Sequence, residues 1–360
     1  MSDHNIKIIS SMKIFKSFIF LFLCLSFRAL ETNRICNYDE MNIGQWIYRN
    51  DSNLTKSFRC CGGDGNDWQD PSLAGYCFAN ETLIASGRAC YCDELLKTRH
   101  SVSEREKYFW KTDNCTTLDW NATYFCELLG QRKILILGDS TCRQTASTLR
   151  SMIQNDNPKG KCGMQILNRD SDYLVPINDI NPKPLVHERS GVFYEHIHQV
   201  QPDIVVLATG AHYLNIDSYK SMLYNLAKKI EAIRRHYKNP PKFIWKTQNP
   251  GHHACKTGPN EKPYKNISEI VVYDDKNKWN YHRIYDQLAI NMSNSIDMKV
   301  IDMSPLYLRV DGHVGYLAWD LRGGDCLHYC MPGPLNIFSV LMMHLLRNLD
   351  PSGNDDDFSV

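Results

Sequence analysis

The pattern of apolar and polar positions changes near residue 131, and from there short apolar runs alternate with segments of helical spacing. Residues 133–137 and 203–208 are predicted to be buried strands, because each is a short apolar run rich in β-branched side chains. A helix is predicted at 141–153, directly after the first strand. The remaining predicted elements are strands at 243–247 and 298–303 and helices that include 222–233, 281–292 and 335–346.

Strands that alternate with helices predict a parallel sheet with helices on both faces. In such a sheet, ligands bind beyond the carboxyl ends of the strands. Ser140, Gly210 and Thr247 all lie at the carboxyl ends of predicted strands. We therefore expect the functional residues of the chain to meet at one edge of the sheet.

Residues 32–130 have a different character, since they lack helical periodicity and are rich in Gly, Asp, Asn and Cys. In an oxidising compartment, such crowded cysteines predict a small, loop-rich module held together by disulfides. The tryptophans of this segment are expected to pack inside it or against the next domain, with a glycan-binding platform as the alternative. They are Trp46, Trp68, Trp110 and Trp120.

The first 31 residues predict entry into the secretory pathway. Lys13 and Lys16 precede an apolar run at 18–27, which has the length of a signal-peptide core. Residues 1–31 are therefore expected to be a signal peptide or a single uncleaved membrane anchor, which leaves the protein secreted or held in the Golgi lumen. Several Asn-x-Ser/Thr sequons agree with this route. Loss of Cys24 with the leader leaves an odd number of cysteines, and Cys142 is expected to be the unpaired one.

The charge balance of the chain argues against nucleic acid as a partner, and its hydropathy argues against a membrane span after residue 31. Lys and Arg number 41 against 40 Asp and Glu, so the chain carries no electrostatic footprint for nucleic acid. No segment after residue 31 is long and apolar enough to be predicted to span a bilayer. The acidic tail at 351–360 is expected to be disordered.

A serine nucleophile with a nearby base is the main chemical hypothesis. Ser140 stands at a strand-to-helix switch, where the N–H at the start of the helix helps to hold an oxyanion. Asp325 and His328 lie three residues apart, so the carboxylate could orient the imidazole that takes the serine proton. Gly210 could present a second N–H to the substrate, because it has no Cβ. Arg143 either steadies a substrate oxygen or forms a surface salt bridge.

The cysteines around His328 leave two arrangements open. A zinc site could use Cys326, His328, Cys330 and Cys255 together with His252 or His253. Alternatively, a disulfide from Cys326 or Cys330, for example to Cys255, would fix the loop that carries the base. We favour the disulfide and expect no metal, because a secreted chain tends to oxidise such cysteines.

Several motifs resemble those of the plant trichome-birefringence-like polysaccharide O-acetyltransferases and the wider PC-esterase group of the SGNH (GDSL) superfamily. The two specific motifs are Gly-Asp-Ser-Thr-Cys-Arg at 138–143 and Asp-Cys-Leu-His-Tyr-Cys-Met-Pro-Gly at 325–333. Looser similarity extends over most of the chain after residue 31. It includes Cys36 and the segments 44–46, 108–115, 209–210, 246–252 and 308–313.

The resemblance implies a flavodoxin-like α/β/α catalytic domain over 131–350 and a triad of Ser140, His328 and Asp325. Candidate oxyanion or substrate-binding residues are Gly210, Arg143, His212 and Asp139. Two positions depart from the family pattern. Gln144-Thr145 stands where the plant proteins more often have Asn-Gln, and His212 stands where the superfamily usually places an oxyanion Asn.

The resemblance also implies acyl esters on glycans as substrates. The leading hypothesis is an O-acyltransferase of the secretory lumen, most simply an O-acetyltransferase, that works through an acyl-serine intermediate. The alternatives are an ester hydrolase of the same fold and a secreted, non-catalytic binding glycoprotein on an SGNH scaffold. We expect no bound cofactor, an acyl donor such as acetyl-CoA as co-substrate, and a glycan or polysaccharide acceptor. The sequence predicts no oligomeric state.

Overall fold

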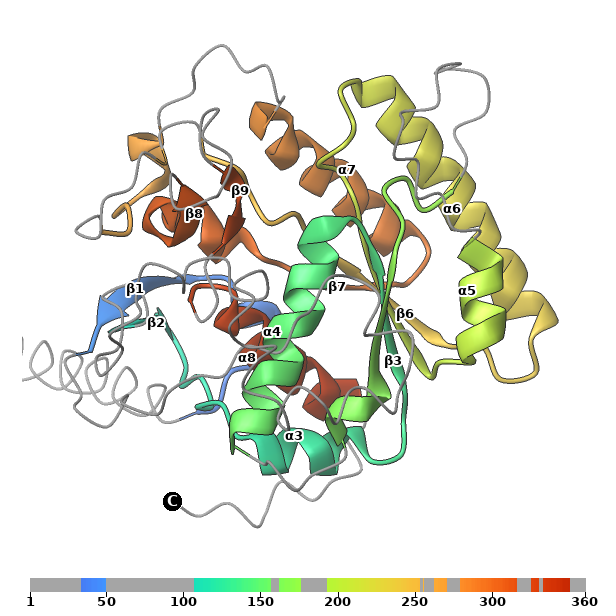
Figure 1. Cartoon of the computed structure of the whole chain (residues 1–360), viewed down its shortest axis with the longest axis horizontal. Helices are drawn as coiled ribbons and strands as arrows, with labels where there is room; N and C mark the ends of the chain where they lie inside the picture. The colour runs from blue at the N-terminus through green and yellow to red at the C-terminus, as the bar shows by residue number, and fades with distance from the viewer. Residues whose placement is uncertain are drawn as a thin grey trace, which may run out of the picture.

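The computed structural model describes residues 34–49, 107–156, 162–175, 193–252, 255, 262–270, 279–315, 325–329 and 333–349. A five-stranded parallel sheet in the order β4-β3-β5-β6-β7 forms its centre (Figure 1). Numbered along the chain from its first strand, this order is 2-1-3-4-5, as in flavodoxin. The predicted fold class is confirmed. The strands are β3 (Ile134–Gly138), β4 (Ile166–Asp170), β5 (Ile204–Ala208), β6 (Lys242–Lys246) and β7 (Lys299–Ile301).

Helices cover both faces of the sheet, so the domain has three layers (Figure 1). One face packs against α3, α4 and α8, and the other against α5, α6 and α7. The helices are α3 (Ala122–Leu129), α4 (Ser140–Asp156), α5 (Phe193–Val200), α6 (Ile216–His236), α7 (His282–Ser295) and α8 (Asn336–Leu349). Short 3-10 helices are η1 (Tyr38–Glu40), η6 (Cys162–Gln165), η7 (Ile267–Glu269), η8 (Trp279–Tyr281), η9 (Ser304–Leu308) and η10 (Val310–Gly312).

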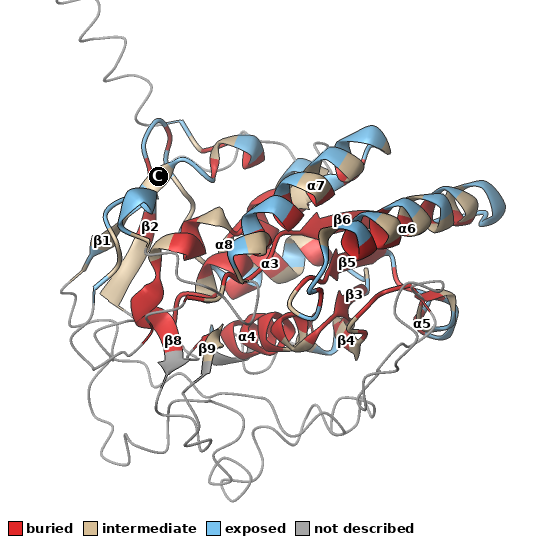
Figure 2. Ribbon diagram, turned by 90° about the horizontal axis from the view of Figure 1, so that it is seen from above, coloured by how far each residue is buried: buried red, intermediate tan, exposed pale blue. Residues whose placement is uncertain are grey.

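Burial on both faces explains the unbroken apolar runs of the central strands. Ile134 and Ile136 of β3 point to the α3-α4-α8 side, whereas Leu135 and Leu137 point to the opposite side. Every residue of β3 and β5 is buried, as the red strands of Figure 2 show. In contrast, α6 and α7 carry exposed faces (Figure 2), which matches the helical spacing of their apolar residues.

Two short antiparallel pairs lie outside the main sheet. The strands β1 (Gly44–Tyr48) and β2 (Tyr108–Thr112) pair with each other, and β8 (His313–Gly315) pairs with β9 (Asp325–Tyr329). The segment 32–130, which shows no helical periodicity in the sequence, contains the helix α3 near its end. This helix has only two turns, and it begins at Asn121, whose side chain accepts a hydrogen bond from the N–H of Tyr124.

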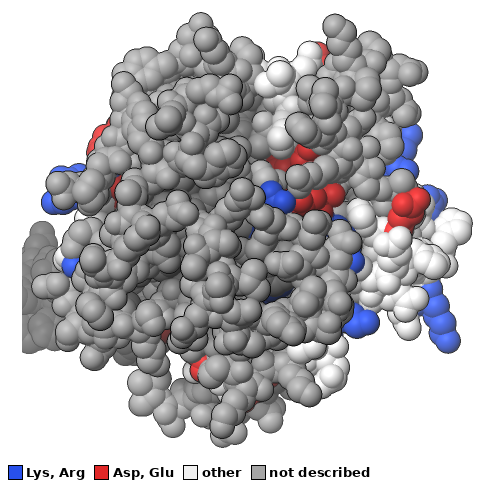
Figure 3. Space-filling model, viewed as in Figure 1, with Lys and Arg blue, Asp and Glu red and all other residues white. Residues whose placement is uncertain are grey.

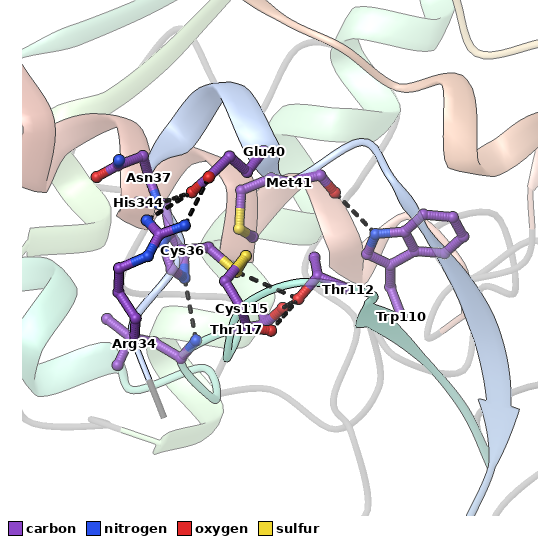
Figure 4. Close-up of a disulfide and its surroundings, with 11 residues drawn as sticks. Arg34, Cys36, Asn37, Glu40, Met41, Trp110, Thr112, Cys115, Thr117 and His344 are labelled. Atoms are coloured by element: carbon purple, nitrogen blue, oxygen red, sulfur yellow. Dashed lines mark hydrogen bonds and ion pairs between the residues drawn. A yellow bond between two sulfur atoms is a disulfide. The ribbon is translucent and has the colours of Figure 1, made fainter. Parts of the chain in front are cut away.

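The described part of the N-terminal segment packs against the sheet domain. A disulfide joins Cys36 to Cys115 (Figure 4), and a second one ties Cys126 of α3 to Cys162 of η6. Cys36 and Phe125 belong to the same hydrophobic cluster as Ile134. Among the described residues, the core therefore continues across position 130 without a break.

The indoles of this segment point inward. Trp110 Nε1 donates to the carbonyl of Met41 at 2.8 Å (Figure 4), and Trp46 Nε1 donates to the carbonyl of Pro305 at 2.8 Å. The expected packing role is confirmed for these two tryptophans, whereas Trp68 lies outside the described residues. The ring of Trp120 packs against Phe125.

A buried imidazole connects the segment to α8. His344 Nε2 accepts from the N–H of Leu118 at 3.1 Å. Burial lowers the pKa of His344 to about 4, so the imidazole is neutral and free to accept this hydrogen bond at neutral pH.

Three expectations concern membranes and chain ends. Within the described ranges, none of the helices combines the length and hydropathy that crossing a bilayer requires. The expected signal segment at 1–31 and the acidic tail at 351–360 lie outside the described residues.

A buried carboxyl joins three segments at the carboxyl end of the sheet. Asp286 of α7 accepts from the N–H of Gln248 at 2.7 Å and from the hydroxyl of Tyr307 at 2.9 Å. Burial disfavours the carboxylate and raises the pKa of Asp286 to about 7.

We predict that Asp286→Asn removes a pH-dependent loss of stability. A raised pKa in the folded state means that the stabilising contribution is complete below the unfolded pKa of about 4. This contribution is lost as the pH rises through about 7. Urea unfolding across this range should show the wild type losing stability relative to the neutral variant. Asp119→Asn, at an exposed position, serves as the control, and parallel curves for wild type and Asp286→Asn would contradict the prediction.

Candidate active site

Ser140 lies at the first position of α4, directly beyond the end of β3, and it is half-buried. Gly138 at the end of β3 allows the close approach of β5, since a Cβ there would lie 1.9 Å from the carbonyl oxygen of Ala208. Asp139 caps the helix, because its Oδ1 accepts from the N–H of Thr141 at 2.9 Å and from the Thr141 hydroxyl at 2.7 Å. The serine is thus presented at the amino end of a capped helix.

Asp139 also connects this turn to the one after β5. Its Oδ2 lies 3.4 Å from the backbone N–H of Ala211, which donates to it. The side chain is fully buried. In this structure the carboxylate oxygens of Asp139 therefore face the two loops and not the molecular surface.

His328 reaches Ser140 from the small β8-β9 sheet. His328 Nε2 lies 2.8 Å from Ser140 Oγ, although the two residues are 188 positions apart. Both side chains are half-buried, so the pair is accessible from solvent. The distance allows the hydroxyl to donate to an unprotonated Nε2, which is the contact that a serine nucleophile and its base require.

A buried glutamine holds β9 against α4. The amide of Gln144, one turn after Ser140, donates through Nε2 to the carbonyl of Tyr329. Its Oε1 accepts from the N–H of Tyr329 at 3.1 Å. Because Tyr329 follows His328 directly, this two-way contact fixes the position of the imidazole relative to the serine.

A disulfide and two hydrogen bonds secure the other contacts of β9. Cys255 is joined to Cys326, and the N–H of His252 donates to the carbonyl of Cys326 at 3.0 Å. The hydroxyl of Tyr329 donates to the carbonyl of Pro250 at 2.9 Å. The prediction of a disulfide that pins this loop is confirmed.

Cys255 and Cys326 form a disulfide with each other, so neither can serve as a ligand in the alternative zinc site. The part of the chain that the structure describes contains no group of three His, Cys, Asp or Glu side chains that could hold a metal. Cys330 and His253 lie outside the described residues.

Asp325 begins β9 and pairs with Gly315 of β8. Its side chain lies outside the described part of the structure. Its role as the partner of His328 therefore stays a prediction.

Gly210 is buried at the end of the segment that follows β5. A Cβ at this position would lie 2.6 Å from the side-chain amide of Gln248, so a larger residue would force that amide to move. The same amide donates to the carbonyl of Thr209. The expected role of the Gly210 N–H as an oxyanion donor stays a prediction.

The other predicted substrate-binding residues, Arg143 and His212, each contact an aspartate. Arg143 Nη1 lies 3.0 Å from Asp170 Oδ2, so the salt-bridge alternative describes its contact in this structure. His212 Nε2 lies 3.5 Å from Asp172 Oδ1. Near the centre of the face drawn in Figure 3, described side chains of both signs are visible. The substrate-binding roles of Arg143 and His212 stay predictions.

Cys142 is the free cysteine of the described residues, as predicted. It is buried, and its thiol donates to the carbonyl of Ala208 at 3.4 Å. Burial raises the pKa of Cys142 to about 12, so the sulfur stays protonated and is not a competing nucleophile.

Comparisons with known proteins find sequence similarity to one family of acyl esterases. Residues 185–345 match the model of PC-Esterase, the GDSL/SGNH-like acyl-esterase family found in Pmr5 and Cas1p. Over 314 residues, the chain is 25% identical to Protein trichome birefringence-like 18 of Arabidopsis thaliana. The chain is thus similar to the PC-esterase family over residues 185–345. The alignment with the Arabidopsis relative covers 67% of the chain and 58% of that relative, so the chain spans about six tenths of the relative's length.

Two further similarities concern named enzymes. Over 55 residues, the chain is 36% identical to Xyloglucan O-acetyltransferase 4 of Populus trichocarpa, which covers 14% of the chain and 13% of that protein. The crystal structure of an acetyl xylan esterase aligns with 58% of this chain and 97% of its own, at 13% identity and a TM-score of 0.34.

Sequence reasoning missed the positioning residues of the site. Gln144 was noted only as a departure from the family pattern, and its spacing of one helical turn from Ser140 was the available signal. Its partner is a backbone amide 185 positions away, and no local pattern reveals such a contact.

We predict that Gln144→Ala lowers the free energy of unfolding on the order of 3 kcal/mol, because two buried backbone groups of Tyr329 lose their partners. Loss of the contact between Gln144 and the main chain of Tyr329 should also slow the labelling of Ser140 by a fluorophosphonate probe. Chemical unfolding and the labelling rate measure the two effects. Gln287→Ala, on the exposed side of α7, is the matched control. Equal stability and equal labelling rates in both variants would contradict the role of Gln144 in positioning β9.

Proposed function

We propose that this protein is a serine O-acyltransferase that moves an acyl group, most simply acetyl, onto a glycan through an acyl-Ser140 intermediate. The observation that carries the proposal is the 2.8 Å distance between Ser140 Oγ and His328 Nε2. The similarity of residues 185–345, which include His328, to an acyl-esterase family supports acyl chemistry at this site.

In the first half of the reaction, Ser140 Oγ attacks the carbonyl carbon of the acyl donor while His328 Nε2 takes the hydroxyl proton. The carbonyl oxygen becomes an oxyanion, and the N–H at the start of α4 and the N–H of Gly210 are its proposed donors. The tetrahedral intermediate then expels the leaving group of the donor, which receives the proton from His328. Asp325 is proposed to stabilise the imidazolium.

In the second half, a sugar hydroxyl attacks the acyl-serine and passes its proton to His328 Nε2. Collapse of the second tetrahedral intermediate releases the acylated sugar, and the proton returns to Ser140 Oγ. Atoms and charge balance over the cycle, and no bound cofactor takes part. We propose an activated acyl donor of the acetyl-CoA class as the co-substrate.

Two observations support a glycan acceptor and a secretory location. A relative over a short segment carries the name Xyloglucan O-acetyltransferase 4, which states a polysaccharide acceptor for that protein. Three disulfides join described cysteines, which is typical of chains that fold in an oxidising compartment. We propose that the protein works in the secretory pathway, held in the Golgi lumen by its N-terminal segment or secreted.

We predict that Ser140→Ala lowers turnover of an activated acetyl ester by on the order of 10⁴-fold or more, and that His328→Ala costs nearly as much. The two effects should not add in the double variant, because the serine and the histidine act as one unit. Steady-state kinetics on the ester, with labelling of Ser140 by a fluorophosphonate probe, measures both.

The exposed residues Ser295 and His236 provide matched controls, as Ser295→Ala and His236→Ala. Wild-type turnover in Ser140→Ala would refute the nucleophile. Absence of labelling and turnover in folded, glycosylated wild-type protein would favour a binding glycoprotein instead.

Hydrolysis is the second candidate function, because the matched family is described as an acyl-esterase family. Transfer and hydrolysis share the acyl-serine and differ in whether a sugar or water attacks it. We expect incubation with an acetyl donor and a glycan panel to yield a mass increase of one acetyl group on one class of glycan. Free acetate at the same rate with and without glycans would identify a hydrolase.

A further inference from the structure

Two buried histidines lie behind the β9 strand. His252 follows the segment after β6, and His313 begins β8. His252 Nδ1 and His313 Nε2 face each other at 2.6 Å. Such a short distance between two ring nitrogens requires a proton between them, since two lone pairs would repel.

The outer nitrogens of both rings contact carbonyl oxygens. His252 Nε2 lies 2.8 Å from the carbonyl oxygen of Tyr307. His313 Nδ1 lies 3.1 Å from the carbonyl oxygen of His328. Because a carbonyl oxygen only accepts hydrogen bonds, both outer nitrogens must carry a proton.

The proton count follows from these contacts. A neutral imidazole has one N–H, and each ring uses its own toward a carbonyl. Two neutral rings would therefore present two bare nitrogens to each other at 2.6 Å. A third proton, placed between the inner nitrogens, turns this repulsion into a charge-assisted hydrogen bond.

We propose that His252 and His313 share one proton, carry a single positive charge between them, and act as a positioning device for His328. The positioning part rests on the proposed function, in which His328 is the base. The link is direct, because the outer N–H of the charged pair donates to the main-chain carbonyl of His328. Neither ring touches the reacting atoms, so both are positioning residues.

The surroundings of the pair favour one positive charge. The ring of Tyr329 lies 4.2 Å from that of His313 between ring centres, and Tyr264 lies 6.4 Å from His252. Aromatic faces attract cations. Tyr307, which accepts from His252 through its carbonyl, donates through its hydroxyl to Asp286.

One cation near the histidine pair, Arg309, already has a negatively charged partner. The buried guanidinium of Arg309 pairs with Asp311 at 2.8 Å, in the segment that leads to His313. Among the described residues, the titratable groups that contact the pair or its direct partners include three tyrosines, His328, Asp286 and this ion pair. Burial raises the pKa of Tyr307 and of Tyr329 well above the ordinary tyrosine value, so both rings stay neutral.

Nitrogen NMR of histidine-labelled protein tests the shared proton without any need for turnover. In folded Ser140→Ala protein at neutral pH, we expect the four ring nitrogens of the pair to show three bound protons. Signals are assigned by their loss in His252→Gln and in His313→Asn. Two protons on the four nitrogens, as in two neutral rings, would overturn the proposal.

Replacement of His313 separates positioning from packing. An asparagine amide nitrogen takes the place of Nδ1, so His313→Asn keeps a donor for the His328 carbonyl, whereas His313→Leu removes it. We expect His313→Leu to lower kcat on the order of 10²-fold with little change in KM, because a misplaced base slows the chemical step. His313→Asn should recover most of this loss. Equal kcat values for His313→Leu and wild type, or no recovery in His313→Asn, would refute the positioning role.

A second NMR comparison separates this proposal from the proposed function. Ser140→Ala should move the Nε2 signal of His328 in the wild-type background and in His313→Asn, because Ser140 Oγ lies 2.8 Å from this atom. The same substitution should leave the signal unmoved in His313→Leu. If the wild type has no turnover, the proposed function fails, and these signals still decide whether His313 holds His328. An equal movement in all three backgrounds would overturn the positioning role.

Discussion

The docking of β9 onto α4 is the contact on which the candidate site depends. Ser140 belongs to the parallel sheet domain, whereas His328 belongs to a two-stranded sheet outside it. Among the described residues, side-chain contacts and a main-chain hydrogen bond from His252 to Cys326 hold the second sheet against the first. The amide of Gln144 binds both polar groups of Tyr329, and the Cys255–Cys326 disulfide anchors the opposite end of β9. This docking places the imidazole of His328 2.8 Å from the hydroxyl of Ser140.

The location of the site follows from the order of the strands, and this part could be predicted from the sequence. In the order β4-β3-β5, the connection through α4 leaves on one face and the connection through α5 on the other, so β3 and β5 flank a switch point. Ser140 follows one of these strands and Gly210 the other. Buried parallel strands are unbroken apolar runs, so β3 and β5 could both be predicted from the sequence. Ser140 and His328 could be named because few residue types perform this chemistry.

The remainder could not be predicted, because tertiary contacts decide it. The strand β4 (Ile166–Asp170) contains Asn168 and Arg169, and its pairing with β3, not its apolar character, makes it a strand. Gly210 was expected to serve an oxyanion, but the constraint visible in the structure is the amide of Gln248 packed against it. The His252–His313 contact joins residues 61 positions apart, and no spacing rule connects them.

The N-terminal segment stabilises the candidate site, because its strands β1 and β2 pack against the buried side chain of Arg309. This guanidinium is fully buried between the Asp311 carboxylate and two aromatic rings of the β1-β2 pair. Its centre lies 4.4 Å from the ring centre of Trp46 and 5.4 Å from that of Tyr108. A buried ion pair is stable only where its surroundings are well packed, so β1 and β2 stabilise the short segment that runs from Arg309 to His313. His313 in turn binds the carbonyl of His328. The cysteine-rich N-terminal segment, which looks in the sequence like an independent module, thus supports the candidate base through three consecutive contacts: the aromatic rings with Arg309, Arg309 with Asp311, and His313 with His328.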